Sequence, residues 1–471
     1  MSRLLSCLAI LAAAVVSACT LAPAYERPAL PTPATWPAQG GGAPQAGADA
    51  SSAANLAWRD VFIDRRLQAV IELALDQNRD LRIAVGNIAK ARAQYGVQRS
   101  NLYPSIDAGA GLTRSRTPAS LSPTGSAVEG NVFTADVGLA SYEVDLFGRV
   151  RSLNEAALQS FFAAEENRRA AQISLIAEVA NDYLALAADQ DLLRLATDTL
   201  NARDASLGLT RSRFKAGAAS ELDVNQTETL AEQARTDVAA AATRVDQDRN
   251  ALRLVVGAEV PVDLLPSGQI QSVQLRQDLP PGLPSDVLVR RPDVLSAEHA
   301  LKAQNADIGA ARAAFFPKIT LIGQGGTAST ELSGLFAAGS GAWSFAPRIS
   351  LPIFNGGANV ANLNIARAGR DIAVSQYEKA IQSAFRDVSD ALAVQANIGL
   401  RIASQERLVA AADNARRLSQ ARYDRGVDSY LTLLDAQRTL YAAQQSLIST
   451  RLAQVSNRVT LYTALGGGAE R

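Results

Sequence analysis

The chain has 471 residues and carries 46 basic and 46 acidic side chains, so its net charge is +0. This balance excludes the strong positive field of nucleic-acid-binding proteins, and no nucleic-acid partner is expected. Hydrophobic residues make up 48% of the chain and aromatic residues only 5%. Alanine and leucine therefore supply most of the apolar content, which favours long, closely packed helices over a bulky globular core.

Residue types that carry metal or acid–base chemistry are scarce. The only cysteines are Cys7 and Cys19, and the single histidine is His299. Common metal sites and catalytic triads need several partners, so we expect His299 to be a surface residue. We expect no metal and no soluble cofactor, and the protein should not be an enzyme.

Residues 1–18 have the pattern of a secretory signal, with Arg3 ahead of an apolar run over residues 8–16. Residues 16–19 (VSAC) resemble the bacterial lipobox, in which a cysteine receives lipid before cleavage. A diacylglycerol and an N-palmitate on Cys19 are therefore expected, and the alternative is an ordinary signal with an incidental cysteine. No later apolar run is long enough for a spanning helix, so any membrane crossing must be made by strands.

The first half of the mature chain reads as arm, helix, strand hairpin and long helix. Residues 19–57 are rich in Pro, Ala and Gly and predict an extended arm. A helical pattern runs from Trp58 to Leu102 with a pause at residues 78–80, and apolar residues then alternate over 106–112 and 133–139 around a polar loop at 117–131. These strands have the length of a membrane hairpin, although a soluble sandwich hairpin would show the same alternation.

A long helix is predicted between Gly148 and Gly217, because neither proline nor glycine appears before Gly208. Leucines at 193, 200 and 207 and Phe214 recur every seven residues, the spacing of a coiled-coil seam. At about 1.5 Å per residue such a helix is about 100 Å long. Residues 215–220 predict a tight turn, and Ser220 can cap a return helix of about half that length.

The second half repeats this course after a proline-rich connector. Asp293 is expected to cap a helix directly after Pro292, Pro317 to stop it, and strands to follow at 319–325 and 342–351. The paired positions include Gly96 with Gly309, 213 residues apart, and Arg213 with Arg422, 209 apart. The predicted divisions are a signal (1–18), an arm (19–57), a first repeat (58–257), a connector (258–292), a second repeat (293–465) and a tail (466–471).

Four strands and two helical hairpins leave a single chain incomplete. Four strands cannot close a barrel, and lipid does not tolerate an open sheet edge. A ring of identical chains solves this problem: two copies give eight strands, and three give twelve with room for an aqueous lumen.

The chain resembles the TolC-like outer-membrane factors of tripartite efflux systems of the RND type, in particular their OprM/NodT-type lipoprotein branch. The resemblance is carried by residues 284–293 (PSDVLVRRPD), 297–298 (AE), 308–309 (IG), 316–317 (FP) and 422–437 (RYDRGVDSYLTLLDAQ). It implies a mainly α homotrimer with a 12-stranded β-barrel in the outer membrane, a long α-helical barrel in the periplasm and an equatorial girdle.

The resemblance also implies a function and partners. The expected function is a passive exit duct for drugs or other small organic compounds. The expected partners are a periplasmic adaptor (a membrane fusion protein) and an inner-membrane RND transporter, and the duct itself should contact outer-membrane lipid. The alternatives within the family are type I protein secretion and metal-ion efflux. A pore-less structural coiled-coil lipoprotein is the alternative of another class, and it would show polar residues on both faces of the strands.

The resemblance places a gate at the turn of the second helical hairpin. Leu431 and Asp435 are spaced i, i+4 and so lie on one helix face. In the family, a leucine and an aspartate at these motif positions form the closed periplasmic aperture, and threefold symmetry would make a ring of three carboxylates. Arg422 and Tyr423, with their counterparts Arg213 and Phe214, resemble the contacts between hairpins that hold the tip shut.

Overall fold

The computed structural model describes residues 20–33, 35–37, 56–123, 125–276, 279 and 287–467. The predicted signal, Cys19, most of the arm, part of the connector and tail residues 468–471 lie outside the described residues. The chain folds as two compact units, and each takes segments from both halves of the sequence. The first consists of Asn87–Glu165, Ser296–Tyr377 and the described part of Met1–Ala29; the second of Leu30–Gly86, Glu166–Leu295 and Glu378–Arg471.

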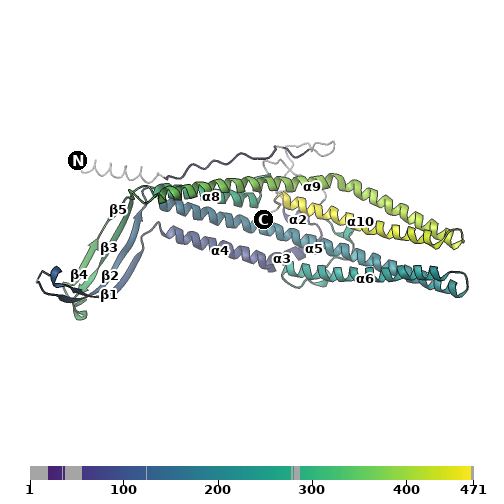
Figure 1. The fold of residues 1–471 in the computed structure, drawn as a ribbon, viewed down its shortest axis with the longest axis horizontal. Helices are drawn as coiled ribbons and strands as arrows, with labels where there is room; N and C mark the ends of the chain where they lie inside the picture. The colour runs from purple at the N-terminus through teal and green to yellow at the C-terminus, as the bar shows by residue number, and fades with distance from the viewer. Residues whose placement is uncertain are drawn as a thin grey trace. The chain divides into compact units, whose positions relative to one another are not determined.

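The second half of the chain repeats the element order of the first (Figure 1). Two short helices, α2 (Trp58–Val61) and α3 (Arg65–Gln77), come first. The first course is then α4 (Arg79–Ser100), β1 (Ile106–Thr117), β2 (Val128–Val144), α5 (Arg149–Lys215) and α6 (Glu221–Val256). The second is α8 (Pro292–Ala313), β3 (Lys318–Ser329), β4 (Gly341–Phe345) with β5 (Arg348–Ser350), α9 (Ala358–Asp424) and α10 (Tyr430–Ala464). The long helices α5 and α9 have 67 residues each, and the return helices α6 and α10 have 36 and 35.

Three local predictions were wrong. Helix α8 begins at Pro292, so Asp293 lies in its first turn and is not the N-cap; proline suits the first helical position because its missing N–H would have no partner there. The fourth strand is divided into β4 and β5 around Pro347, which cannot donate a ladder hydrogen bond. The first strand hairpin is longer than predicted, because β1 and β2 pair from Ile106↔Leu139 to Thr117↔Val128.

The strands form one antiparallel sheet in the order β1-β2-β3-β4, with β5 also paired to β3. The register aligns one predicted apolar face across the sheet, since Ala108 pairs with Val137, Val137 with Gly325, and Gly325 with Trp343. Side chains on this face are exposed in the single chain: Ile106 is 72% exposed and Trp343 is 82% exposed. The prediction that the strands carry an apolar face is thus confirmed, which contradicts the expectation of the pore-less coiled-coil alternative.

Backbone approach between β2 and β3 depends on glycine. A Cβ added at Gly326 would lie 2.1 Å from the carbonyl oxygen of Ala135, and one at Gly138 would lie 2.6 Å from that of Gly323. A side chain at either position would therefore separate the two strands.

In the first unit, the described start of the chain lies along α8. The carboxylate of Glu298 is 3% exposed and accepts hydrogen bonds from Arg27 and from the Tyr25 hydroxyl, and Lys302 lies 3.1 Å away. Farther along α8, Arg312 and Asn305 donate to the carbonyl oxygens of residues 21 and 23. Polar contacts therefore fix this extended segment in register with the helix.

The second unit contains the main hydrophobic core. Buried side chains of α2 and α3 pack against α5, α6 and α10; Phe62, for example, meets Tyr462 edge to face at 5.5 Å. The Asp64 side chain accepts hydrogen bonds from the backbone N–H groups of residues 66 and 67 and so caps α3. Arg291 links the start of α8 to the end of α10 by donating to the carbonyl oxygen of Ala464.

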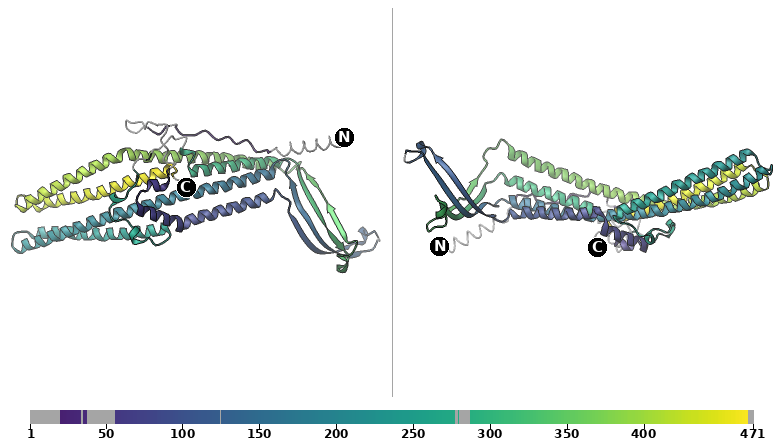
Figure 2. Two further views of the ribbon diagram at one scale, coloured as in Figure 1. Left: turned by 180° about the vertical axis from the view of Figure 1, so that it is seen from behind. Right: turned by 90° about the horizontal axis from the view of Figure 1, so that it is seen from below.

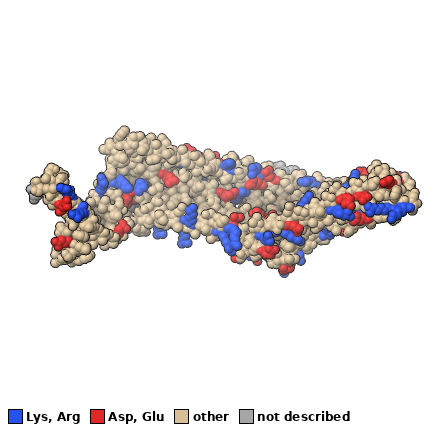
Figure 3. All heavy atoms as spheres, turned by 60° about the horizontal axis from the view of Figure 1, so that its bottom comes forward, with Lys and Arg blue, Asp and Glu red and all other residues tan. Residues whose placement is uncertain are grey.

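None of the helices in the described part of the chain is both long and apolar enough to span a membrane. Acidic and basic side chains are interspersed on the face drawn in Figure 3, in keeping with the zero net charge.

Candidate functional site

The candidate site lies at the turns of the two helical hairpins, α5 with α6 and α9 with α10 (Figure 2), and both turns belong to the second unit. Both turns have the same backbone pattern. In the first turn the backbone N–H groups of Gly217 and Ala218 donate to the carbonyl oxygens of Phe214 and Arg213, respectively. In the second turn those of Gly426 and Val427 donate to the carbonyl oxygens of Tyr423 and Arg422. Each glycine has φ above +70°, a region that glycine reaches without steric cost, and each turn therefore closes with the same C-terminal motif.

The return helices begin differently. Ser220 caps α6 as predicted: its hydroxyl oxygen accepts from Asp223 N–H, and the Asp223 carboxylate accepts from Ser220 N–H in a capping box. Ser429 holds the equivalent position before α10 with extended backbone but without a side-chain cap hydrogen bond.

Arg422 forms an ion pair inside its own turn. Its guanidinium donates to both carboxylate oxygens of Asp428, at 2.6 and 2.8 Å. These hydrogen bonds lower the pKa of Asp428. Within the described part of the single chain Arg422 forms its ion pair with Asp428 and none with the other hairpin, because the tight turn brings the carboxylate six residues later within bidentate range.

Arg213 and Tyr423 form the contact between the two hairpins. The Arg213 guanidinium lies over the Tyr423 ring, 5.4 Å from its centroid, and 3.8 Å from the Asp424 carboxylate. The Tyr423 ring also packs against Tyr430, whose neighbours Leu433, Leu434 and Leu230 are buried. A cation–π contact and a small apolar cluster thus join the first hairpin to the second beside their turns.

Leu431 and Asp435 lie on the side of α10 that faces away from this cluster. The side chain of Leu431 is 60% exposed, and Asp435 is exposed too, whereas Leu433 and Leu434 are 1% and 3% exposed. Within the described residues Asp435 has neither an ion pair nor a hydrogen bond. The pair therefore presents one apolar and one acidic side chain to the surroundings of the single chain.

The structure brings together some of the predicted tip residues and not others. Arg213 and Tyr423 lie in the predicted contact between hairpins. Phe214 is 45% exposed and makes no ring contact in the part of the chain that the structure describes. The residues named for the gate, Leu431 and Asp435, are close in space and exposed, and their role as a gate stays a prediction.

His299 is not the surface residue that we predicted. It is half-buried, its Nδ1 lies 2.7 Å from Oε1 of Gln159, and its ring packs against Phe162. Burial lowers its pKa, so the neutral ring is favoured. Among the described residues no group of three His, Cys, Asp or Glu side chains is arranged to hold a metal ion.

The role of Arg203 and the contacts of Glu298 were not predicted from the sequence. Arg203 on α5 lies seven residues from both Ala196 and Thr210, and all three residues are buried. Its counterpart 209 residues later is Ala412, so the arginine departs from the repeat as well as from the apolar pattern. That double departure was the available signal. Glu298 lies in the motif at 297–298 that carries the family resemblance, but its contacts were not predictable, because its partners Tyr25 and Arg27 lie more than 270 residues away in the sequence.

Comparison with known proteins shows the family. The family model described as "Outer membrane efflux protein" matches residues 70–258 and 283–467, one match in each half of the chain. The chain belongs to the outer membrane efflux protein family. It is 45% identical to the toluene efflux pump outer membrane protein TtgC of Pseudomonas putida, over 96% of this chain and 93% of that protein. It is 43% identical to the outer membrane protein OprJ of Pseudomonas aeruginosa, over 98% and 95%.

Solved structures agree with this assignment. The open state of the MtrE outer membrane channel of Neisseria gonorrhoeae is 41% identical, covers 96% of this chain and 99% of that one, and superimposes with a TM-score of 0.85. A membrane protein of Pseudomonas aeruginosa gives 42% identity and a TM-score of 0.90, with 96% and 98% covered. This family member therefore has the fold of the TolC-like outer membrane channels, acts in efflux, and is located in the outer membrane.

Proposed function

We propose that this outer membrane efflux protein is a homotrimeric passive exit duct for small organic compounds, gated at its helical tips. The chain is 45% identical to proteins named for the efflux of toluene and of antibiotics, and 45% identical to one named for solvent efflux. Apolar and aromatic organic molecules are therefore the substrate class, and the duct performs no chemistry on them.

Three copies are needed because one chain leaves its sheet open. Among the described residues β1 pairs only with β2, and β4 and β5 pair only with β3, so both edges of the sheet carry backbone groups without strand partners in the single chain. Lipid cannot satisfy such groups. Joining β1 of one copy to β4 and β5 of the next closes a twelve-stranded barrel whose exposed apolar side chains, such as Trp343, face the lipid.

The observation that carries the gate is the uncovered pair on α10. Leu431 and Asp435 lie within two turns of the start of α10, on one face, with neither side chain buried in its own chain. Threefold symmetry makes from them an apolar constriction and a ring of three carboxylates. Such a ring favours cations and, when narrow, blocks the passage of water and ions.

Single-channel recording in planar bilayers tests the gate. Asp435→Ala removes the three charges, so we expect the preference for cations over anions to fall and the conductance to change. The control is Asp246→Ala, which removes an exposed acid from α6 that pairs with Arg249 and lies outside the tip turns. Unchanged conductance and ion preference in Asp435→Ala would remove this residue from the gate.

Partners follow from the gated tip. A duct without an energy source must receive its cargo, so we assign this chain a periplasmic adaptor that docks at the helical hairpins and an inner-membrane RND transporter. Docking opens the tip by weakening the Arg213 contact with Tyr423, a shift in a two-state equilibrium. Arg213→Ala should therefore raise the open fraction in bilayers without any adaptor.

The lipid anchor is part of the same proposal. Cys19 carries diacylglycerol and an N-palmitate, which place the start of the mature chain at the membrane surface. Intact-mass measurement of the mature protein should show both additions in the wild type and neither in Cys19→Ser. A mature wild-type mass without lipid would reject the anchor and leave the channel proposal standing.

A further inference from the structure

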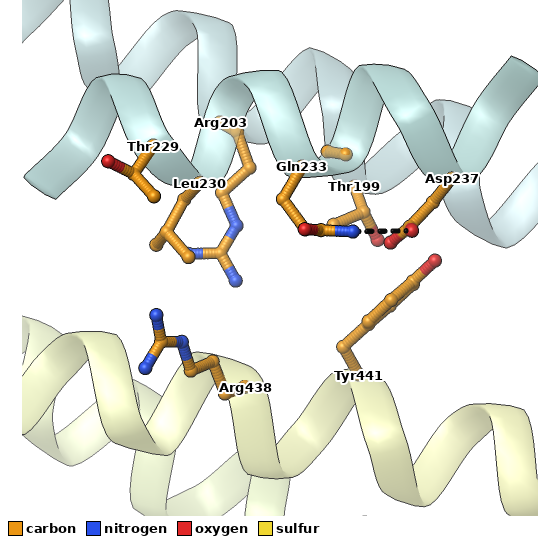
Figure 4. A pocket seen from close by; sticks show the side chains of 9 residues that line it. Thr199, Arg203, Thr229, Leu230, Gln233, Asp237, Arg438 and Tyr441 are labelled. Carbon is orange, nitrogen blue, oxygen red and sulfur yellow. Dashed lines mark hydrogen bonds between the residues drawn. The ribbon is translucent and has the colours of Figure 1, made fainter.

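A pocket of about 230 Å³ lies in the second unit, between the hairpin of α5 with α6 and the helix α10. Its walls carry two guanidinium groups, Arg203 from α5 and Arg438 from α10, which reach into the same gap (Figure 4). The volume exceeds the roughly 30 Å³ that one water molecule occupies in the liquid, so there is room for a small polyatomic ion.

Arg203 is a buried cation without a counter-ion. The residue is only 7% exposed, and no carboxylate of the described residues lies within ion-pair distance of it. The one hydrogen bond of Arg203 to another described residue goes from Nη1 to the side-chain oxygen of Gln437, which is neutral. A guanidinium has five N–H donors, so most of them have no protein acceptor. Burial of a charge in this condition is costly.

Arg438 adds a second positive charge to the pocket and does not neutralise that of Arg203. It is exposed, and it has no ion pair within the described part of the chain. Burial lowers the pKa of Arg203, and the charge of Arg438 lowers it further. The protein has thus placed two like charges on opposite walls of one pocket, an arrangement that a bound anion would relieve.

The one acid that lines the pocket is held away from the arginines. Asp237 accepts a hydrogen bond from the Gln233 amide at 3.0 Å, as Figure 4 shows, and within the described residues it forms no ion pair with either arginine. The hydroxyls of Thr199 and Thr229 donate to backbone carbonyls of their own helices. The N–H donors left for a ligand therefore come from the two guanidiniums.

We propose that this pocket binds a small oxyanion of the phosphate class between Arg203 and Arg438. A tetrahedral anion offers oxygens in opposite directions, so it can accept hydrogen bonds from both walls at once, which a planar carboxylate does less well. Because Arg203 belongs to the first helical hairpin and Arg438 to the second, the bound anion joins the two hairpins. The proposal does not depend on the gate or on transport.

Binding of inorganic phosphate to the purified protein in detergent tests the proposal. Isothermal titration calorimetry should give one site per chain in the wild type. Loss of one guanidinium in Arg438→Gln should weaken binding roughly tenfold or more, because a charge-assisted hydrogen-bonded pair is lost. Arg203→Ala, which installs the residue found at position 412 of the second repeat, should abolish it. The matched control is Arg401→Gln, an exposed arginine on α9, which should bind as the wild type does.

Thermal unfolding gives a second readout, since a ligand of the folded state raises its stability. The melting temperature should rise more in phosphate than in sodium chloride of equal ionic strength. Phosphate also stabilises proteins by exclusion from their surface, and that part should persist in Arg438→Gln. Should Arg203→Ala fail to fold, Arg438→Gln still decides the matter, because its arginine is exposed. The absence of measurable heat in the wild type, or equal phosphate effects in the wild type and Arg438→Gln, would overturn the proposal.

Discussion

A single carboxylate, that of Glu298, fixes the start of the described chain on α8. It is almost fully buried and has three partners, Arg27, Lys302 and Tyr25. Burial alone would raise its pKa, but the hydrogen bonds from Lys302 and Arg27 outweigh burial, and the pKa is lowered. Removing this carboxylate takes away the one acceptor that Arg27 and the Tyr25 hydroxyl share on α8.

We predict that Glu298→Ala releases residues 20–28 from α8. Backbone amides of this segment should exchange hydrogen faster, and the melting temperature should fall, because hydrogen bonds to a charged group contribute about 1.5–3 kcal/mol. Hydrogen exchange read by mass spectrometry checks the first effect. Glu155→Ala, at an exposed position of α5, is the control; equal exchange in both variants would show that Glu298 does not hold the segment.

Asp248 makes stability depend on pH. Burial, a hydrogen bond with Asp189 and the charges of Asp189 and Asp182 raise the pKa of Asp248 to about 7, against the opposing charge of Arg244. In the unfolded chain an aspartate has a pKa of about 3.9. Between about pH 4 and 7 the folded state therefore holds a proton that the unfolded state has lost, and stability falls as pH rises through this window.

Asp248→Asn should remove this part of the pH dependence. We expect its melting temperature to change less than that of the wild type between pH 5 and 7, and to exceed the wild-type value at pH 8. Asp246→Asn, an exposed neighbour on the same helix, should keep the wild-type slope. An equal dependence of melting temperature on pH in the wild type and Asp248→Asn would contradict the raised pKa of Asp248.

At the scale of elements, helix ends depend on glycines at equivalent points of the two repeats. Gly257 ends α6 with φ +76°, and Gly466 follows α10 with φ +75°. The two positions differ in their surroundings. A Cβ at Gly257 would lie 2.7 Å from the carbonyl oxygen of Gln77, whereas a Cβ at Gly466 would meet the flexible side chain of Arg291 at 3.0 Å.

Gly257→Ala should therefore destabilise the protein more than Gly466→Ala. The left-handed backbone alone costs alanine about 1–2 kcal/mol, and the contact with Gln77 adds to this at Gly257. Gly208→Ala is the opposite case, because this glycine lies inside α5 with open space around it, and alanine there should stabilise by up to about 1 kcal/mol. The melting temperature should be lowest for Gly257→Ala, higher for Gly466→Ala and highest for Gly208→Ala. Equal decreases in melting temperature for Gly257→Ala and Gly466→Ala would contradict the prediction.

Elements were predictable where they depend on local signals. Heptad spacing and the absence of proline and glycine gave α5, and Ser220 gave the start of α6, because these signals act within a few residues. The extent of the first strand hairpin and the break at Pro347 depend on pairing with other strands. At the tips, the Arg213 contact was implied by the family resemblance, whereas the Arg422 pair with Asp428 depends on how tightly the turn closes. The pocket that Arg203 lines forms only where the two hairpins pack together, and no local sequence pattern predicts that packing.

At the scale of the whole molecule, a single chain can form neither a closed β-barrel nor a ring of carboxylates. Among the described residues its sheet has two open edges and an exposed apolar face, and Leu431 and Asp435, the pair proposed for the gate, are exposed on α10. Both features become useful only when copies assemble around an axis, because one chain supplies a single carboxylate and four strand paths. Assembly and conduction are therefore one property in this account.

The most direct measurement is the mass of the purified particle in detergent, by light scattering corrected for bound detergent, followed by single-channel recording of the same material. Three chains per particle and discrete, ion-conducting openings are predicted. A monodisperse single chain that leaves bilayers impermeable to ions would contradict the account.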